Sequence, residues 1–390
     1  MATEISERPA AKPVKYVQGV TIRLVGDSGG VRHRRGSPVD HPDPAGPTDA
    51  SGAARRRAVT TPMNPLPADP LQTAPTPIIM DVDTGIDDAF ALMFAVRHPG
   101  IDLRAVTCVA GNSTVDHVVA NTCYVLDAAG AGTIPVGRGA TAPLLSPVPD
   151  TGHFHGKDGL GGFSRPSDRR TSPLAAVDLL HHELSAAIGN GELVTLVATG
   201  PQTNIALLLR THPEVAAGIE RIVFMGGSAS SGNVTAVAEF NVFHDPEAAA
   251  ITLAAARDLD IPVTMYGLDV FEQVQVDLDD AATLRSRLDP ACQLAGALII
   301  ARAKGADTAS IGDAGTVCAI ADPDGLGTER HEVRVELGHG FTRGQTVVDR
   351  RAWPDQIAAH ALHSAPTMVD VALTVDARGY RNLWLETLVG

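Results

Sequence analysis

Four carboxylates lie within eight consecutive positions of the chain, at Asp81, Asp83, Asp87 and Asp88. The apolar run 78–80 before them predicts a short buried strand, and the amphipathic pattern after Asp87 predicts a helix. Carboxylates at such a strand-to-helix turn bring negative charges close together. Because these charges repel one another unless a cation lies among them, the first hypothesis is a hard divalent metal bound by oxygen ligands.

The competing interpretation is that these acids only cap and solvate the start of the helix. Aspartate is a preferred N-cap residue, and acidic side chains are favourable in the first helical turn. That explanation suits Asp87 and Asp88. It does not account for Asp81 and Asp83, which lie on the strand side of Gly85.

Short apolar runs alternate with longer helical patterns from Pro77 onward. Further strands are predicted at residues 103–109, 133–136, 193–198, 221–225 and 262–266. Helices are predicted at residues 114–129, 175–188, 202–210 and 246–255, and we expect Thr203 and Asn204 to act as caps. This alternation predicts an α/β fold, a single large domain with a mainly parallel, doubly wound (Rossmann-like) sheet and helices on both faces. Residues 139–173 are rich in Gly, Pro and His and predict a long loop that serves as a lid or binding loop.

Polar or glycine-rich turns follow four of the predicted strands. Asp81 and Asp83 end the first strand, and Gly111-Asn112 follows the second. Thr199-Gly200 and Met225-Gly226-Gly227 end two later strands. Ligands bind outside the carboxyl ends of the strands in open α/β sheets. The sequence therefore predicts that these turns form one binding rim.

Composition separates the first 76 residues from the remainder. This segment is rich in Pro, Ala, Gly and Arg and carries a net charge of +3. Because the whole chain carries −14, the remaining residues carry −17. We expect residues 1–76 to be a disordered or poorly ordered extension and residues 77–390 to be the catalytic domain. Met63 is an alternative start. The Arg runs are not followed by an apolar segment, so no secretion signal is indicated.

Charge and cysteine usage bear on partners and location. An acidic body argues against nucleic acid as a partner, and no apolar stretch approaches the length of a membrane span. The four cysteines are scattered in apolar contexts, which is typical of buried free thiols in a reducing compartment. They are Cys108, Cys123, Cys292 and Cys318. We expect a cytoplasmic protein that forms a homodimer or homotetramer.

A series of sequence blocks, in this order and spacing, resembles the inosine-uridine preferring nucleoside hydrolases from about Pro77 to the C-terminus. The hallmark is Asp81-Val82-Asp83-Thr84-Gly85-Ile86-Asp87-Asp88. Supporting blocks are Ala110-Gly111-Asn112, His155-Gly156-Lys157-Asp158-Gly159-Leu160-Gly161, Ala198 to Asn204, Phe224 to Gly227, Gly232 to Glu247, and Thr342 to Thr346. The resemblance implies the nucleoside hydrolase fold. It also implies hydrolysis of the N-glycosidic bond of purine or pyrimidine ribonucleosides to ribose and free base, in nucleoside salvage.

The resemblance also implies a role for each matching residue. A tightly held Ca²⁺ would be bound by Asp83, Asp88, the backbone carbonyl of Thr199, and Asp313. The ribose 2′- and 3′-hydroxyls would be held by Asp87, Asn112 and Asn241, and the 5′-hydroxyl by Asn233 and Glu239. Met225 would pack near the sugar. Asp83 would also be the general base for the attacking water, with Asp81 supporting it from behind. Glu239 and Asn241 lie in a segment without an evident helix-capping pattern, which favours a ligand-binding role.

The chain departs from the family pattern at the base end of the expected site. Many members carry His immediately before the last metal-binding Asp, as the acid for the leaving base, and here that position holds Gly312. His155 is then the candidate leaving-group acid, with a tyrosine, a water chain or aromatic stacking as alternatives. A second departure is Phe271-Glu272, where the family often has Thr followed by a polar residue.

Two other classes of protein remain open from the sequence. One is a haloacid-dehalogenase-like phosphatase, in which Asp81 and Asp83 would be the nucleophile and its acid–base partner. That fold does not require Asp87-Asp88 or the block from Asn233 to Asn241. The other is a non-catalytic ribose- or nucleoside-binding protein on the same scaffold. Retention of Asp83, Asp88 and Asp313 argues against it.

Overall fold

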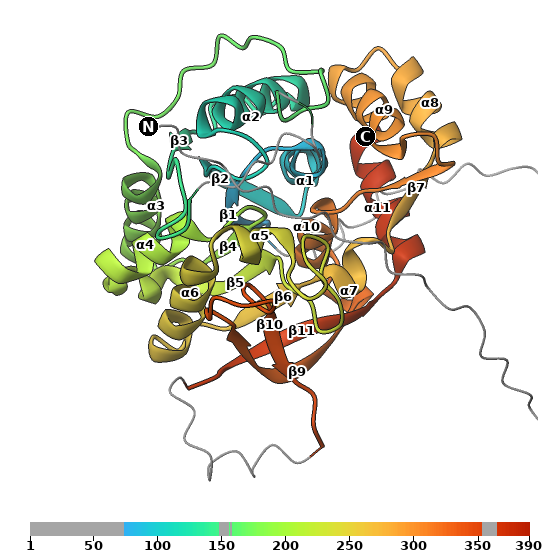
Figure 1. Ribbon diagram of the computed structural model, residues 1–390. Coiled ribbons are helices and arrows are strands. Elements are labelled where there is room, and N and C mark those ends of the chain that lie inside the picture. Colours follow the sequence, from blue (N-terminus) through green and yellow to red (C-terminus); the bar gives the residue numbers. More distant parts are fainter. Residues whose placement is uncertain (1–73, 148–155, 157, 353–364) are drawn as a thin grey trace, which may run out of the picture. The chain divides into compact units, whose positions relative to one another are not determined.

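The central feature of the protein is a nine-stranded sheet with strand order β10-β9-β11-β6-β5-β4-β1-β2-β3 (Figure 1). The computed structural model describes residues 74–147, 156, 158–352 and 365–390. The strands of this sheet are β1 (Thr76–Val82), β2 (Ile101–Cys108), β3 (Val136–Arg138), β4 (Val194–Ala198), β5 (Ile219–Met225), β6 (Val263–Tyr266), β9 (Leu326–Val335), β10 (Thr346–Asp349) and β11 (Thr367–Val375). A separate antiparallel pair joins β7 (Gln275–Asp277) to β8 (Thr308–Ser310).

Helices surround the sheet (Figure 1). They are α1 (Ile86–Arg97), α2 (Val115–Ala129), α3 (Ala176–Asn190), α4 (Thr203–Thr211), α5 (Phe240–His244), α6 (Pro246–Asp258), α7 (Leu268–Phe271), α8 (Leu278–Ser286), α9 (Pro290–Ala303), α10 (Ala314–Ala321) and α11 (Ala377–Val389). Two 3₁₀ turns, η1 (Pro213–Gly218) and η2 (Pro323–Gly325), complete the described elements.

Strand β1 shows why both faces of the sheet are covered. Successive side chains of a strand point to opposite faces. Ile78, Met80 and Val82 pack into a core with helices α1, α2, α9, α10 and α11. Ile79 packs into a second core with α3, α4 and α6. Both faces are therefore apolar, which agrees with the near-continuous apolar run that a buried parallel strand requires.

Strands β2, β1, β4, β5 and β6 are neighbours and run parallel. β11 pairs parallel with β6 but antiparallel with β9, and β10 pairs antiparallel with β9. The predicted α/β fold with a large, mostly parallel sheet is thus confirmed. The antiparallel edge was not predicted, because no strand or helix was assigned after residue 266.

Between residues 78 and 266 the predicted elements correspond to β1–β6 and to helices α1–α4 and α6, with one shifted strand. The strand expected at residues 133–136 is observed at Val136–Arg138. Pro135 has no N–H for a sheet hydrogen bond, and its carbonyl accepts from Val106 N–H at 3.0 Å, so the regular strand begins after it. The described part of the predicted loop 139–173 contains neither helix nor strand.

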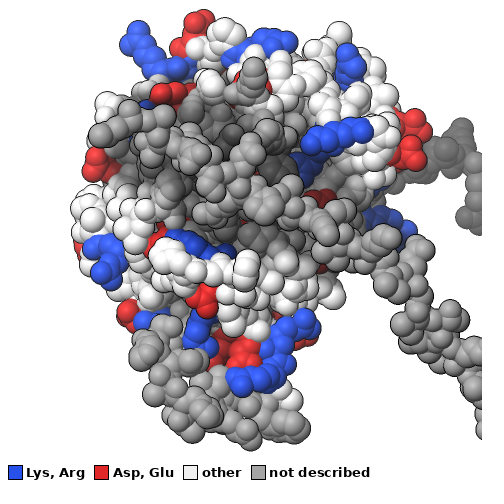
Figure 2. All heavy atoms as spheres, in the orientation of Figure 1, with Lys and Arg blue, Asp and Glu red and all other residues white. Residues whose placement is uncertain are grey.

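The remaining general predictions have mixed outcomes. All four cysteines are free and buried, as expected. Among the described residues no helix has the length and apolar character needed to cross a bilayer. On the face drawn in Figure 2, described Lys and Arg side chains lie interspersed with Asp and Glu. The predicted extension 1–76 lies outside the described residues except for its last three positions.

Candidate functional site

One cavity of about 400 Å³ opens where the parallel strands end. Because β2, β1, β4, β5 and β6 run parallel side by side, the turns after them meet at one edge of the sheet. The predicted site residues that line this cavity are Asp87, Asn112, Thr199, Met225, Asn233, Glu239, Asn241 and Asp313. The structure therefore brings together residues that lie far apart in the sequence.

Three carboxylates gather beside the cavity. Asp87, Asp88 and Asp313 are buried, and each brings an oxygen to within 4.8 Å of the others. Burial raises the pKa of Asp313 well above its usual range, and the nearby charges of Asp87 and Asp88 raise it further. Burial, followed by the charge of Asp87, raises the pKa of Asp88 to about 6. The ionised form of this cluster needs compensating positive charge nearby.

Asp83 lies directly after β1 and is fully buried. Its Oδ2 accepts the Asn112 backbone N–H at 2.7 Å, and its Oδ1 has no hydrogen-bond partner among the described residues. A side chain at Gly111 would overlap Asp83 Oδ2, so glycine is what allows this close approach. Burial and the charge of Asp88 raise the pKa of Asp83 well above its usual range. The cluster of Asp87, Asp88 and Asp313 thus contains Asp87, whereas the family resemblance implies Asp83 as a ligand.

Thr199 connects the carboxylates to the rest of the cavity. It follows β4, and its hydroxyl donates to Asp88 Oδ1 at 2.7 Å. Its backbone carbonyl accepts from the Asn241 side-chain amide at 2.7 Å. The same amide also donates to the carbonyl of Met225 at 3.2 Å. These bonds fix the Asn241 amide, and its buried Oδ1 has no hydrogen-bond partner within the described part of the chain.

Asp81 lies behind the cavity within β1. Its Oδ1 accepts from the Thr107 hydroxyl at 2.6 Å and from the Asn204 side-chain amide at 2.8 Å. Burial raises the pKa of Asp81 to about 7, against the lowering effect of these two bonds. The prediction that Asn204 and Thr203 cap helix α4 is wrong. Asn204 binds Asp81, and Thr203 donates to Asp245 at 2.7 Å, because both side chains turn inward to satisfy buried carboxylates.

Glu239 lines the cavity and is also the N-cap of helix α5. The expectation that its segment has no helix-capping residue is therefore wrong. Its carboxylate accepts the backbone N–H groups of Asn241 and Val242, at the start of α5, and of Gly227. Helix α5 spans only five residues, too short to produce a periodic pattern in the sequence. Burial raises the pKa of Glu239 to about 7 despite these three bonds. Glu239 thus orders the loop after β5 and contributes to the cavity wall.

The two departures from the family pattern meet in space. Gly312 has φ +50°, and a Cβ atom built on it would lie 2.6 Å from Cζ of Phe271 and 2.9 Å from Cβ of Asp87. Real Cβ atoms do not approach heavy atoms so closely, so the Phe271 ring occupies the space into which a larger residue at position 312 would extend. The glycine and the phenylalanine are therefore one packing arrangement.

Sequence reasoning missed Arg302, on α9, although it lines the cavity. Its Nη1 donates to Asp87 Oδ2 at 3.0 Å, and its guanidinium lies 5.8 Å from the centroid of the Phe271 ring. Burial alone would lower the pKa of Arg302, but the carboxylates of Asp87, Glu272 and Asp313 raise it. An arginine within an alanine-rich helical stretch gives no local signal of this position. The candidate acid His155 lies outside the described residues.

Comparison with known proteins agrees with this geometry. The family model for Inosine-uridine preferring nucleoside hydrolase matches residues 78–382. The chain is 37% identical over 320 residues to the Pyrimidine-specific ribonucleoside hydrolase RihA of Shewanella sp. (strain MR-7), covering 80% of this chain and 96% of the relative. It is 38% identical over 320 residues to the RihA of Photobacterium profundum, covering 80% and 98%.

Solved structures of nucleoside hydrolases share the fold of this chain. The fold matches a plant nucleoside hydrolase, the PpNRh1 enzyme, with a TM-score of 0.70 and 28% identity, over 80% of this chain and 99% of that one. It matches an Inosine-Guanosine Nucleoside Hydrolase (IG-NH) with a TM-score of 0.72 and 28% identity, over the same shares. The chain therefore belongs to the inosine-uridine preferring nucleoside hydrolase family, whose members are ribonucleoside hydrolases acting on N-glycosyl bonds.

Proposed function

We propose that the protein is a Ca²⁺-dependent hydrolase of pyrimidine ribonucleosides, acting in nucleoside salvage. The observation that carries the proposal is the buried carboxylate cluster at the carboxyl ends of the parallel strands, beside a cavity lined by amides and acids. A site dense in carboxylates stabilises the oxocarbenium-like charge that develops when a glycosidic bond breaks. The names of the RihA relatives support a pyrimidine base.

The residues fit a hard divalent cation. All of the candidate donors are oxygens, which suits Ca²⁺ and disfavours softer metals. Asp83 Oδ1 is buried without a hydrogen-bond partner in the structure, as expected of an atom reserved for a cation. We assign the ion to Asp83, Asp88, the carbonyl of Thr199, and Asp313. When bound, Ca²⁺ would supply Lewis-acid activation of the attacking water.

The protein's own side chains supply the other steps. Asp83 takes the proton of the attacking water as general base. Asn241 accepts a sugar hydroxyl through Oδ1, because its amide nitrogen is already held by Thr199 and Met225. Asp87 and Asn112 bind the same 2′,3′-diol, while Asn233 and Glu239 hold the 5′-hydroxyl. Met225 covers the sugar, and Asp81 supports the loop that carries Asp83.

The remaining assignments are expectations of the same proposal. Residues 77–390 form the catalytic domain, and residues 1–76 are an N-terminal extension to it. The enzyme acts in the cytoplasm as a homodimer or homotetramer. Neither nucleic acid nor membrane is a partner.

The decisive experiment measures base release from a panel of ribonucleosides by protein stripped with chelator and then supplied with Ca²⁺ or Mg²⁺. Uridine and cytidine should be cleaved faster than inosine and guanosine, and only after Ca²⁺ is restored. A matched panel of ribonucleoside 5′-phosphates and p-nitrophenyl phosphate tests the phosphatase alternative. Absence of base release from every nucleoside, with Ca²⁺ bound, would overturn the proposal.

A further inference from the structure

Arg302 supplies a fixed positive charge in the wall of the cavity. Its side chain is 19% exposed, and it is held between Asp87 and the Phe271 ring. Phe271, Glu272 and Ser310 line the same cavity. An arginine remains protonated throughout the working pH range of enzymes.

The reaction creates a need for that charge. When the N-glycosidic bond breaks, the electron pair passes to the base nitrogen, and the departing base becomes anionic unless an acid protonates it. Position 312 carries no side chain, and the Phe271 ring fills the space beside it. Preorganised hydrogen-bond donors stabilise developing negative charge without transferring a proton.

We propose that Arg302 stabilises the departing base as an anion, in place of a side-chain acid. The inference rests on the proposed ribonucleoside hydrolysis. The C1′–N bond breaks with its electrons moving to the base, and the water oxygen bonds to C1′ as its proton passes to Asp83. The guanidinium keeps its protons, and solvent protonates the base after release. The flat Phe271–Arg302 pair also selects planar bases that present a carbonyl oxygen or ring nitrogen to the guanidinium.

The test compares two substrates that share ribose and differ in the leaving group, uridine and 4-nitrophenyl riboside. Arg302→Met removes the charge and Arg302→Lys retains it. Arg302→Met should lower kcat for uridine by about 10²- to 10³-fold, as for loss of one oxyanion donor, and kcat for the nitrophenyl riboside by less than about tenfold. Arg302→Lys should recover part of the uridine rate.

The ratio of the two rates separates this role from a structural one. If Arg302 only holds Asp87, both substrates lose rate equally, because both present the same ribose, and the inference is overturned. The wild-type ratio should also be constant from pH 6 to 10. Two results would instead assign the step to a titrating acid. One is a ratio of uridine rate to nitrophenyl riboside rate that falls at alkaline pH. The other is a selective loss of uridine rate in His155→Ala rather than in Arg302→Met. Failure of the proposed function itself is distinct, since wild type would then cleave neither substrate.

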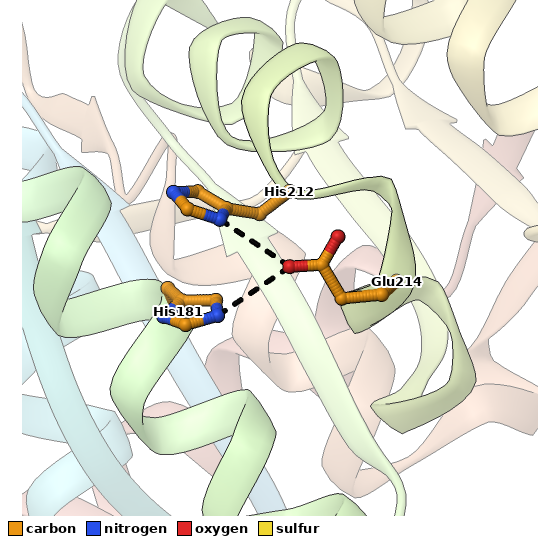
Figure 3. A group of neighbouring side chains, drawn as sticks. All are labelled: His181, His212 and Glu214. Atoms are coloured by element: carbon orange, nitrogen blue, oxygen red, sulfur yellow. Dashed lines mark hydrogen bonds and ion pairs between the residues drawn. The ribbon is translucent and has the colours of Figure 1, made fainter.

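A second, independent observation concerns a cluster remote from these carboxylates in the sequence. His181 of α3, His212 at the end of α4, and Glu214 of η1 point toward one another (Figure 3). Glu214 Oε1 lies 3.3 Å from His212 Nδ1 and 3.5 Å from His181 Nε2, and the two rings stack with centroids 4.2 Å apart. Both nitrogens thus face the same carboxylate oxygen.

Two stacked rings at this separation do not suit a shared tetrahedral ion, whose imidazole ligands would have centroids roughly 5 Å apart. The cluster is therefore a contact between α3 and the α4–η1 corner, in which Glu214 pairs with both histidines.

Discussion

Replacing Gly312 by alanine tests whether Phe271 and Gly312 form a single packing arrangement. The φ of +50° costs an alanine about 1–2 kcal/mol relative to glycine. The new Cβ would lie 2.6 Å from the Phe271 ring, and such overpacking costs a further ~1–3 kcal/mol. Gly312→Ala should therefore lower the free energy of unfolding by about 2–5 kcal/mol. Because the same Cβ would press on Asp87, kcat should fall by about 10²-fold, as for a catalytic group displaced by an ångström.

The assay is urea denaturation at fixed Ca²⁺, with kcat for uridine measured in parallel. Gly132→Ala is the matched control, because Gly132 has φ +57° and no atom lies within 4 Å of the position that a Cβ would take there. It should show only the backbone cost. Phe271→Leu should relieve the contact, so the double variant Gly312→Ala/Phe271→Leu should be less destabilised than the sum of the single variants. Equal destabilisation by Gly312→Ala and Gly132→Ala would refute the packing argument.

The other predictions address the metal, the sugar and the N-terminal segment. Asp83→Ala should lower kcat at least about 10³-fold and abolish Ca²⁺ binding by calorimetry; near-wild-type turnover would contradict the assignment. A 2′-deoxyribonucleoside should have kcat/KM lower than its ribonucleoside by a factor on the order of 10⁴, and comparable values would remove Asp87 and Asn112 from the sugar site. Burial raises the pKa of Asp88 to about 6, so the metal-free fold gains stability below its unfolded pKa near 4 and loses it as pH rises through 6. The rise in Tm on adding Ca²⁺ should accordingly grow from pH 5 to pH 8, and a rise independent of pH would oppose this linkage. A chain starting at Met63 should match the full chain in Tm and kcat, whereas loss of either would show that the first 62 residues pack on the catalytic domain.

The sequence was sufficient for the parallel half of the fold because local patterns mark it. Apolar runs that end in glycine or polar residues identified strands β1, β2, β4, β5 and β6, and the rule for open α/β sheets then grouped the turns after them. Asn112, Thr199 and Met225 do line one cavity, as that grouping required.

What the sequence did not reveal depends on contacts between distant residues. Strand β9 is mostly exposed or half-buried and has many charged side chains, so it has no apolar run to detect. Arg302 lies in a helix that gives no sign of which carboxylate it meets. Asn204 resembled a cap because position alone cannot show that its side chain turns inward to Asp81.

The contact between Arg302 and Asp87 joins residues 215 positions apart, which has a consequence for biosynthesis. At about 5–20 residues per second, the ribosome needs roughly 10 to 40 s to travel from one to the other. During that interval β1 and then α1 are completed, whereas Arg302 of α9 and Asp313, the residue before α10, have not yet been made. The carboxylates after β1 must therefore stay hydrated on the nascent chain until the last quarter of the protein emerges. Chains that terminate before α9 would leave these acids without their guanidinium, and such products should be removed by proteolysis rather than accumulate as inactive enzyme.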